Sequence, residues 1–137
     1  MKLVDANIIL RFLLDDTPAQ AKASEHLFLT FGENLILTDL TFAEIIWVLS
    51  SVYDFNKEEI IEKVQSLFVV DIFKMNRNLL TRALEYYSLY NVAFVDAYLA
   101  AYCQDQNAEG IYSFDRGLDK IKTVKRFEPK IQKADSS

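Results

Sequence analysis

The chain alternates short apolar runs with longer segments of helical periodicity, and this alternation constrains its fold more than any other feature. Strands are predicted at residues 2–4, 35–37, 69–73, 111–113 and 123–127. Helices are predicted at residues 6–14, 18–30, 41–53, 56–67, 76–90 and 95–105, with a helical turn at 116–121. Strands that alternate with helices of this length favour βαβ units. We therefore expect an α/β protein with a three-layer α/β/α fold and a central, mainly parallel sheet.

Length and composition suit a single globular domain. The 137 residues are 51% hydrophobic and 26% charged, which excludes intrinsic disorder. We expect one domain over residues 1–130 and a C-terminal tail at 131–137. A single cysteine, Cys103, excludes an intrachain disulfide. The longest uncharged stretch, residues 86–95, has ten residues, whereas a membrane span needs about 20. Because Asp5 also interrupts any signal-peptide-like start, we expect a soluble, reduced, cytoplasmic protein that contacts no membrane.

Four acids fall at the ends of predicted strands or the starts of predicted helices. Asp5 and Asp115 follow strands, whereas Glu44 and Asp96 lie in the first turns of helices. Ligands of parallel α/β sheets bind at the carboxyl ends of the strands, so we expect the four carboxylates to converge there. Asp5, Glu44 and Asp96 have apolar neighbours on both sides, which predicts that each is at least partly buried.

Each of these acids, taken alone, also has a structural explanation. An acid in the first turn of a helix complements the helix dipole, which contributes about 0.3–1 kcal/mol. Thr41 and Glu44 fit a capping box, and Asp96 and Asp115 fit N-caps. Taken together, however, ionised carboxylates about 5 Å apart repel by roughly 3 kcal/mol per pair at an effective dielectric constant of about 20. Hard oxygen ligands without a His or Cys pair would favour Mg²⁺ or Mn²⁺ as the cation that offsets this cost.

Divalent ions held by carboxylates generate hydroxide and neutralise charge on a phosphate, so hydrolysis of phosphodiesters is the natural reaction for such a site. PIN-domain nucleases carry motifs similar, in order and spacing, to four segments of this chain: Val4-Asp5-Ala6-Asn7, Phe42-Ala43-Glu44-Ile45, Phe94-Val95-Asp96-Ala97 and Ser113-Phe114-Asp115. The closing segment, residues 124–129, resembles the VapC toxins of type II toxin–antitoxin pairs. The resemblance implies a metal-dependent endoribonuclease that hydrolyses RNA, usually as a homodimer, and is held inactive by a cognate antitoxin protein.

The same resemblance implies roles for individual residues. The family's acidic quartet of catalytic metal ligands is matched by Asp5, Glu44, Asp96 and Asp115. Asp119, one helical turn after the last acid, is a candidate for a further ligand through water. Asn7 matches a supporting polar residue two places after the first acid, and Ser113 matches a hydroxyl residue before the last. Leu118 departs from the family pattern, which commonly has a larger aromatic residue there.

Basic residues gather near the C-terminus. The net charge is −5, yet residues 120–133 contain six basic residues and one acid. A basic rim beside an acidic pocket would attract the RNA backbone, because Arg and Lys bind phosphate oxygens. Candidate RNA-binding residues are Arg11, Arg116, Lys122, Lys125 and Arg126. The alternatives are a solvated tail and pairing of the arginines with nearby acids.

Two other classes of protein share parts of this pattern. A haloacid-dehalogenase-like phosphohydrolase also places an Asp after its first strand, but its chemistry requires a second Asp two residues later, where this chain has Asn7. A non-catalytic α/β interaction module would use the acids only as helix caps and would bind no Mn²⁺.

Overall fold

A computed structural model describes residues 1–14, 17–29 and 34–132 of the protein. These residues separate into two compact units that divide between Leu80 and Thr81. The single domain over residues 1–130 stays a prediction. Residues 133–137 of the predicted tail lie outside the described residues, as does Lys133 of the basic segment and the predicted last residue of the helix at 18–30. No helix in the described part of the chain is long and apolar enough to cross a membrane.

The described residues of the first unit form a three-stranded parallel sheet in the order β1-β2-β3. The strands are β1 (Lys2–Leu3), β2 (Leu35–Ile36) and β3 (Phe73–Lys74). Leu35 on the central strand lies opposite Lys2 on one side and Phe73 on the other. The predicted parallel pairing is therefore confirmed, with strands somewhat shorter than the apolar runs.

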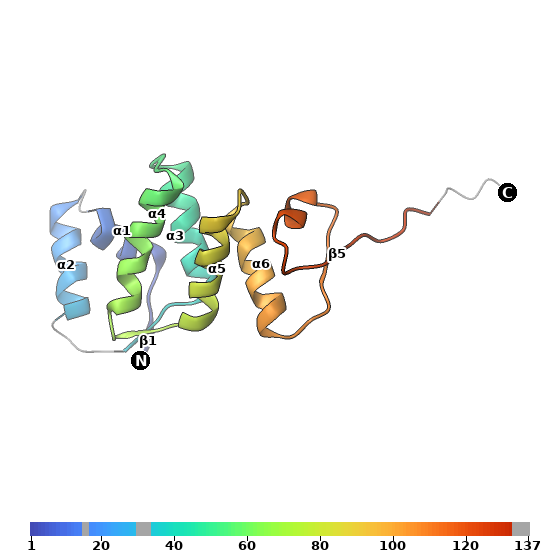
Figure 1. The fold of residues 1–137 in the computed structure, drawn as a ribbon. Helices are drawn as coiled ribbons and strands as arrows, with labels where there is room; N and C mark the ends of the chain where they lie inside the picture. Colours follow the sequence, from blue (N-terminus) through green and yellow to red (C-terminus); the bar gives the residue numbers. More distant parts are fainter. Residues whose placement is uncertain (15–16, 30–33, 133–137) are drawn as a thin grey trace. The chain divides into compact units, whose positions relative to one another are not determined.

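Helices connect these parallel strands, as βαβ units require. Between β1 and β2 lie α1 (Ala6–Leu14) and α2 (Pro18–Leu29). Between β2 and β3 lie α3 (Asp39–Ser51), α4 (Lys57–Gln65) and the short 3₁₀ helix η1 (Ser66–Val69). Figure 1 shows these helices in blue to green beside the sheet. The α/β class is therefore confirmed.

The two α-helices between β2 and β3 begin with different N-caps. Thr38, in an extended conformation, is the N-cap of α3, and its hydroxyl accepts a hydrogen bond from the Thr41 amide at 3.1 Å. The predicted capping box of Thr41 and Glu44 is therefore wrong: the helix starts at the first hydroxyl residue after β2, which moves Glu44 into the second turn. The predicted start of α4 is confirmed, because Asn56 and Glu59 form a reciprocal capping box.

The approach to β3 is less extended than predicted. Residues 69–73 read as one strand, but η1 reaches Val69 and the strand begins only at Phe73. The guanidinium of Arg77 explains this bend, since it donates to three backbone carbonyls of the segment. The acceptors are Phe73 at 2.8 Å, Val70 at 2.9 Å and Phe68 at 3.2 Å. A charged donor thus satisfies carbonyls that a longer strand would have paired.

The core of the first unit lies between its helices and the sheet. Phe42, Ile45 and Leu49 follow one face of α3 at helical spacing and are fully buried. Phe28 of α2 contacts two further rings edge to face, Phe12 at 5.0 Å and Phe73 at 5.1 Å between centroids. These contacts join α1, α2 and β3 into one apolar cluster.

The second unit contains a parallel strand pair and two helices. Helix α5 (Arg77–Leu89) begins before the division and is followed by α6 (Phe94–Asp105), β4 (Ile111–Tyr112), the 3₁₀ helix η2 (Arg116–Lys120) and β5 (Arg126–Phe127). β4 pairs with β5 in parallel. Gly110 permits this pairing, because a Cβ there would lie 2.2 Å from the Lys125 carbonyl oxygen. Within the described residues, each unit thus has its own parallel sheet.

A tyrosine links three elements of the second unit. The buried hydroxyl of Tyr86 on α5 donates to the side chain of Gln104 on α6. It also accepts from the Thr123 hydroxyl at 3.0 Å. This network fixes the chain between η2 and β5 against the two helices, directly before β5 begins.

Candidate metal and nucleic-acid site

The first unit contains two members of the predicted acidic quartet. Asp5 lies two residues after β1, beyond the carboxyl end of the strand, and Glu44 lies in the second turn of α3. Both side chains are exposed, so the predicted partial burial of these two acids is wrong. Their apolar sequence neighbours point into the core while the acids face outward, which is what alternation along a strand end and a helix face allows.

Asn7 and Arg11 lie on α1 and face α2. Together with residues of α2, they line a hollow of about 680 Å³. Arg11 donates to the Thr17 hydroxyl at 3.1 Å and to the Tyr53 hydroxyl at 3.4 Å. Two hydroxyls are thus among the partners of this guanidinium, and a phosphate would have to replace or extend these bonds.

A second hollow, of about 530 Å³, opens at the carboxyl ends of β2 and β3. In it, the Asn76 amide donates to both carboxylate oxygens of Asp39, at 3.1 and 3.2 Å. This bond ties the start of α3 to the loop after β3. The hollow lies at the sheet edge at which α/β proteins bind their ligands.

Asp96 and Asp115 form a carboxylate pair in the second unit. Asp96 lies in the first turn of α6, and Asp115 precedes η2. Burial raises the pKa of Asp96, and the neighbouring charge of Asp115 and a hydrogen bond between the two side chains raise the pKa further. The predicted partial burial of Asp96 is confirmed, since this side chain is half-buried. The pair thus favours either a shared proton or an added cation.

The capping interpretation applies to only one member of this pair. The Asp115 carboxylate accepts a hydrogen bond from the Gly117 amide at 2.8 Å and is the N-cap of η2. Asp96 is not an N-cap, because Ala93 occupies that position and no side chain caps the start of α6. The half-buried carboxylate of Asp96 therefore lies where its charge is costly and where no capping bond accounts for it.

Gly117 lies beside both carboxylates. A Cβ at this position would lie 3.0 Å from Oδ1 of Asp115 and 3.8 Å from Oδ2 of Asp96. Any side chain at this position would crowd the Asp115 carboxylate, so a glycine keeps the pair accessible. Paired hard oxygen donors of this kind suit a divalent cation such as Mg²⁺ or Mn²⁺.

Arg126 and Asp119 bind each other. The guanidinium contacts both oxygens of Asp119, Nε to Oδ1 at 2.9 Å and Nη2 to Oδ2 at 3.2 Å. It also donates to the Ser113 carbonyl at 2.9 Å and to the Glu128 carboxylate. The hydrogen bond from Arg126 lowers the pKa of Asp119. Asp119 is a candidate metal ligand and Arg126 a candidate RNA contact; both stay predictions, and in the structure the two side chains bind each other.

The remaining basic candidates are open to solvent. Arg116, Lys122 and Lys125 are exposed. The ammonium of Lys125 lies 4.9 Å from the centroid of the Phe127 ring. Among the described residues of the basic segment, Lys120 donates to the Asn91 carbonyl at 3.1 Å. Lys120 therefore stabilises the fold, whereas Lys122 and Lys125 are exposed to solvent.

The residues that the structure describes contain no group of three or more His, Cys, Asp and Glu side chains placed to hold a metal ion. The pair Asp96 and Asp115 is brought together, whereas the complete quartet with Asp5 and Glu44 stays a prediction. The donor chemistry of the pair fits Mg²⁺ or Mn²⁺, since it consists only of carboxylate oxygens with excess negative charge.

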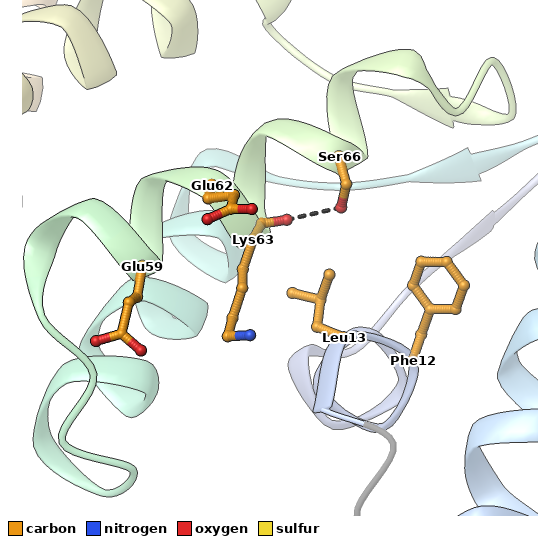
Figure 2. Close-up of a pocket in the computed structure, with 6 residues that line it drawn as sticks. All are labelled: Phe12, Leu13, Glu59, Glu62, Lys63 and Ser66. Atoms are coloured by element: carbon orange, nitrogen blue, oxygen red, sulfur yellow. Dashed lines mark hydrogen bonds between the residues drawn. The ribbon is translucent and has the colours of Figure 1, made fainter.

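A further hollow, between α1 and α4, contains none of the predicted site residues. It measures about 390 Å³, and Figure 2 shows its lining: Phe12, Leu13, Glu59, Glu62, Lys63 and Ser66. Three of its polar residues have structural partners. Glu59 closes the capping box, the Lys63 ammonium lies 4.7 Å from the Phe55 ring, and Ser66 donates to the Lys63 carbonyl at 2.6 Å. We assign no ligand to it.

Comparison with known proteins bears on the family of this chain. A family model described as PIN domain matches residues 2–124, which is most of the chain. The chain belongs to the PIN-domain family. The PIN match includes all four acids of the predicted quartet, and it confirms the resemblance drawn from the sequence motifs. The VapC ribonuclease of Aquifex aeolicus (strain VF5) is 25% identical to this PIN protein over 134 residues, which cover 93% of this chain and 98% of the relative.

Sequence reasoning missed two features beside Asp115. Gly117 has no side chain to mark it, although a glycine two residues after an acid is typical of a turn in which the carboxylate accepts from the backbone. Arg126 was assigned to RNA rather than to the loop of Asp115.

Proposed function

We propose that this PIN-domain protein is a Mg²⁺- or Mn²⁺-dependent endoribonuclease that hydrolyses RNA phosphodiester bonds. The observation that carries the proposal is the half-buried Asp96, which is paired with Asp115 next to Gly117. A carboxylate pair of this kind is unfavourable without a counterion, and the PIN match covers both acids. The ribonuclease name of the Aquifex relative supports RNA as the substrate.

The ligands of the cation would be Asp96 and Asp115, completed by Asp5 and Glu44. When bound, a divalent ion of this kind lowers the pKa of water and neutralises charge that develops on a phosphate. The carboxylates hold the ion, and Asn7 and Ser113 support the loops at which the first and last acids lie. Ser113 does so directly, since its hydroxyl accepts from the Asp115 amide at 2.9 Å.

The exposed cations would bind the RNA backbone. Arg116 directly follows Asp115, and Lys122 and Lys125 lie in the segment between η2 and β5. Arg11 would contribute from α1. Positive side chains next to an acidic pocket offset its repulsion of RNA, while the scissile phosphate contacts the ion.

The similarity to a VapC ribonuclease supports a role as the toxin of a type II toxin–antitoxin pair. We therefore propose a cognate antitoxin protein as partner, a homodimer as the active assembly and the cytoplasm as its location. Expression of the chain alone would then arrest growth, and the product of an adjacent small reading frame would relieve the arrest. Growth arrest that the neighbouring product does not relieve would contradict the antitoxin pairing.

The activity is tested by cleavage of a labelled single-stranded RNA by wild type and by Asp5→Asn. Asn keeps the shape of this exposed side chain and removes a charge that the ion requires, so we expect cleavage to be lost while the unfolding midpoint is kept. Asp71→Asn, an exposed acid outside the proposed site, is the matched control and should cleave at the wild-type rate. Cleavage by Asp5→Asn at the wild-type rate would refute the proposal.

A further inference from the structure

Arg126 contacts both ends of the segment that carries Asp115. At the N-terminal end it donates to the carbonyl of Ser113 at 2.9 Å, and at the C-terminal end it donates to both carboxylate oxygens of Asp119. Asp115 lies between these two anchor points. The Arg126 side chain is only 11% exposed, so it is largely enclosed by the groups that it binds.

Local bonds alone leave this segment weakly determined. Asp115 is held by the Ser113 hydroxyl and by the Gly117 amide, both two residues away. These two bonds set the local turn but do not attach it to the rest of the unit. The Ser113 amide donates to the Phe127 carbonyl at 2.9 Å, and Leu118 is buried. Arg126 adds a charged attachment from β5 that reaches both sides of Asp115.

The chemistry of the contacts favours an arginine. A planar guanidinium can form two parallel bonds to one carboxylate and still donate to a carbonyl and to a second carboxylate, whereas an ammonium cannot match this geometry. Glu128 holds the guanidinium from the strand side. The positive charge is thus offset by Asp119 and Glu128, which leaves Arg126 poorly suited to attract a phosphate.

We propose that Arg126 is a positioning residue of the ion site: it fastens the Ser113–Asp119 segment to β5, so that the Asp115 carboxylate stays opposite Asp96. This inference rests on the proposed function, because it assumes that the Asp96–Asp115 pair binds the ion. Asp119 is then the anchor of the clamp and not a ligand. Groups that orient metal ligands commonly change metal affinity about 10–100-fold when they are removed.

The test is Mn²⁺ affinity, measured by calorimetric titration of the whole protein without RNA. We expect Arg126→Ala to weaken Mn²⁺ binding by at least about tenfold. Arg126→Lys keeps the positive charge but loses the two parallel bonds of the guanidinium. We therefore expect its Mn²⁺ affinity to stay close to that of Arg126→Ala. The matched control is Lys130→Ala, which removes an exposed charge close to β5 and should leave Mn²⁺ affinity unchanged.

A double-mutant cycle with Asp119→Asn tests whether Asp119 anchors Arg126 or is itself a ligand of the ion. If Asp119 only anchors Arg126, the double variant should bind Mn²⁺ no more weakly than Arg126→Ala alone. If Asp119 is itself a ligand through water, the two losses should add. RNA affinity in EDTA gives an independent readout: the clamp predicts that Arg126→Ala and wild type bind a labelled RNA equally well.

The outcomes are distinct. Equal Mn²⁺ affinity of wild type and Arg126→Lys, or a reduced RNA affinity with unchanged Mn²⁺ binding, would overturn the positioning role while leaving the proposed function intact. No Mn²⁺ binding by wild type would overturn the ion site itself. Should Arg126→Ala fail to fold, Arg126→Lys and Asp119→Asn carry the same comparison.

Discussion

Replacing Asp96 by Asn tests whether the Asp96–Asp115 pair is a repulsive ligand set or a structural contact. Asp96 is half-buried and Asp115 is exposed, so their repulsion lies between two limits. For charges about 4 Å apart these limits are about 1 kcal/mol in water and about 4 kcal/mol at a protein surface. The variant also loses a favourable helix-dipole interaction of about 0.3–1 kcal/mol. We therefore expect metal-free Asp96→Asn to be more stable than wild type by about 1–2 kcal/mol at pH 7.

The pH dependence has a defined sign. Because the pKa of Asp96 is raised in the folded protein, the folded state holds this proton more tightly than the unfolded state. The cost of the charged Asp96 is therefore present at neutral pH and is relieved as the pH falls through the raised pKa. The stability advantage of Asp96→Asn over wild type should shrink accordingly on acidification.

Mn²⁺ should reverse the order of stability. An ion that binds only the folded state at 100 times its dissociation constant stabilises wild type by about 2.7 kcal/mol, and the variant should gain much less. The assay is urea unfolding at pH 7 in EDTA and in Mn²⁺, with Glu85→Gln on α5 as an exposed-acid control. A variant that is less stable than wild type in EDTA would show that the Asp96 carboxylate stabilises the fold, and would refute the repulsive pair.

Three further predictions concern other contacts. Arg77→Met should lower the free energy of unfolding by about 3 kcal/mol, because three backbone carbonyls lose a charged donor, whereas Arg82→Met on the same helix should change it by less than about 0.5 kcal/mol in urea titrations. Asn56→Ala should cost about 1 kcal/mol through loss of the α4 capping box, and an unchanged urea midpoint would contradict the cap. The double variant Lys122→Ser, Lys125→Ser should weaken RNA binding by a cleavage-dead Asp5→Asn protein and flatten its salt dependence by about 0.7 per lost phosphate contact; an unchanged slope would assign both lysines to solvation.

Local chemistry made several elements predictable. The Thr17–Pro18 start, the Asn56 cap and the helix face of Phe42, Ile45 and Leu49 each depend on residues within one or two turns, and the structure has all of them. The start of α3 was misjudged because Thr38 and Thr41 both offer a hydroxyl, and only the end of β2 decides between them.

Long-range contacts account for the remainder. Arg77 bends the chain before β3 by binding carbonyls four to nine residues away, and Arg126 joins Ser113 across thirteen residues. Nothing in the local pattern distinguishes these arginines from the exposed Arg116. The pairing of Asp96 with Asp115 could be predicted, because one acid starts a helix and the other follows a strand of the parallel fold. The sequence could not show that only Asp115 is an N-cap.

Metal dependence of RNA cleavage tests the central claim most directly. Purified protein is stripped of metal with EDTA and given a labelled single-stranded RNA, and the cleavage rate is measured as Mn²⁺ is returned stepwise. We expect no cleavage in EDTA and a rate that saturates over the same Mn²⁺ range that stabilises the fold in urea. Cleavage that persists in EDTA, or that is unaffected by Asp115→Asn at any Mn²⁺ concentration, would contradict a carboxylate-held ion as the basis of activity.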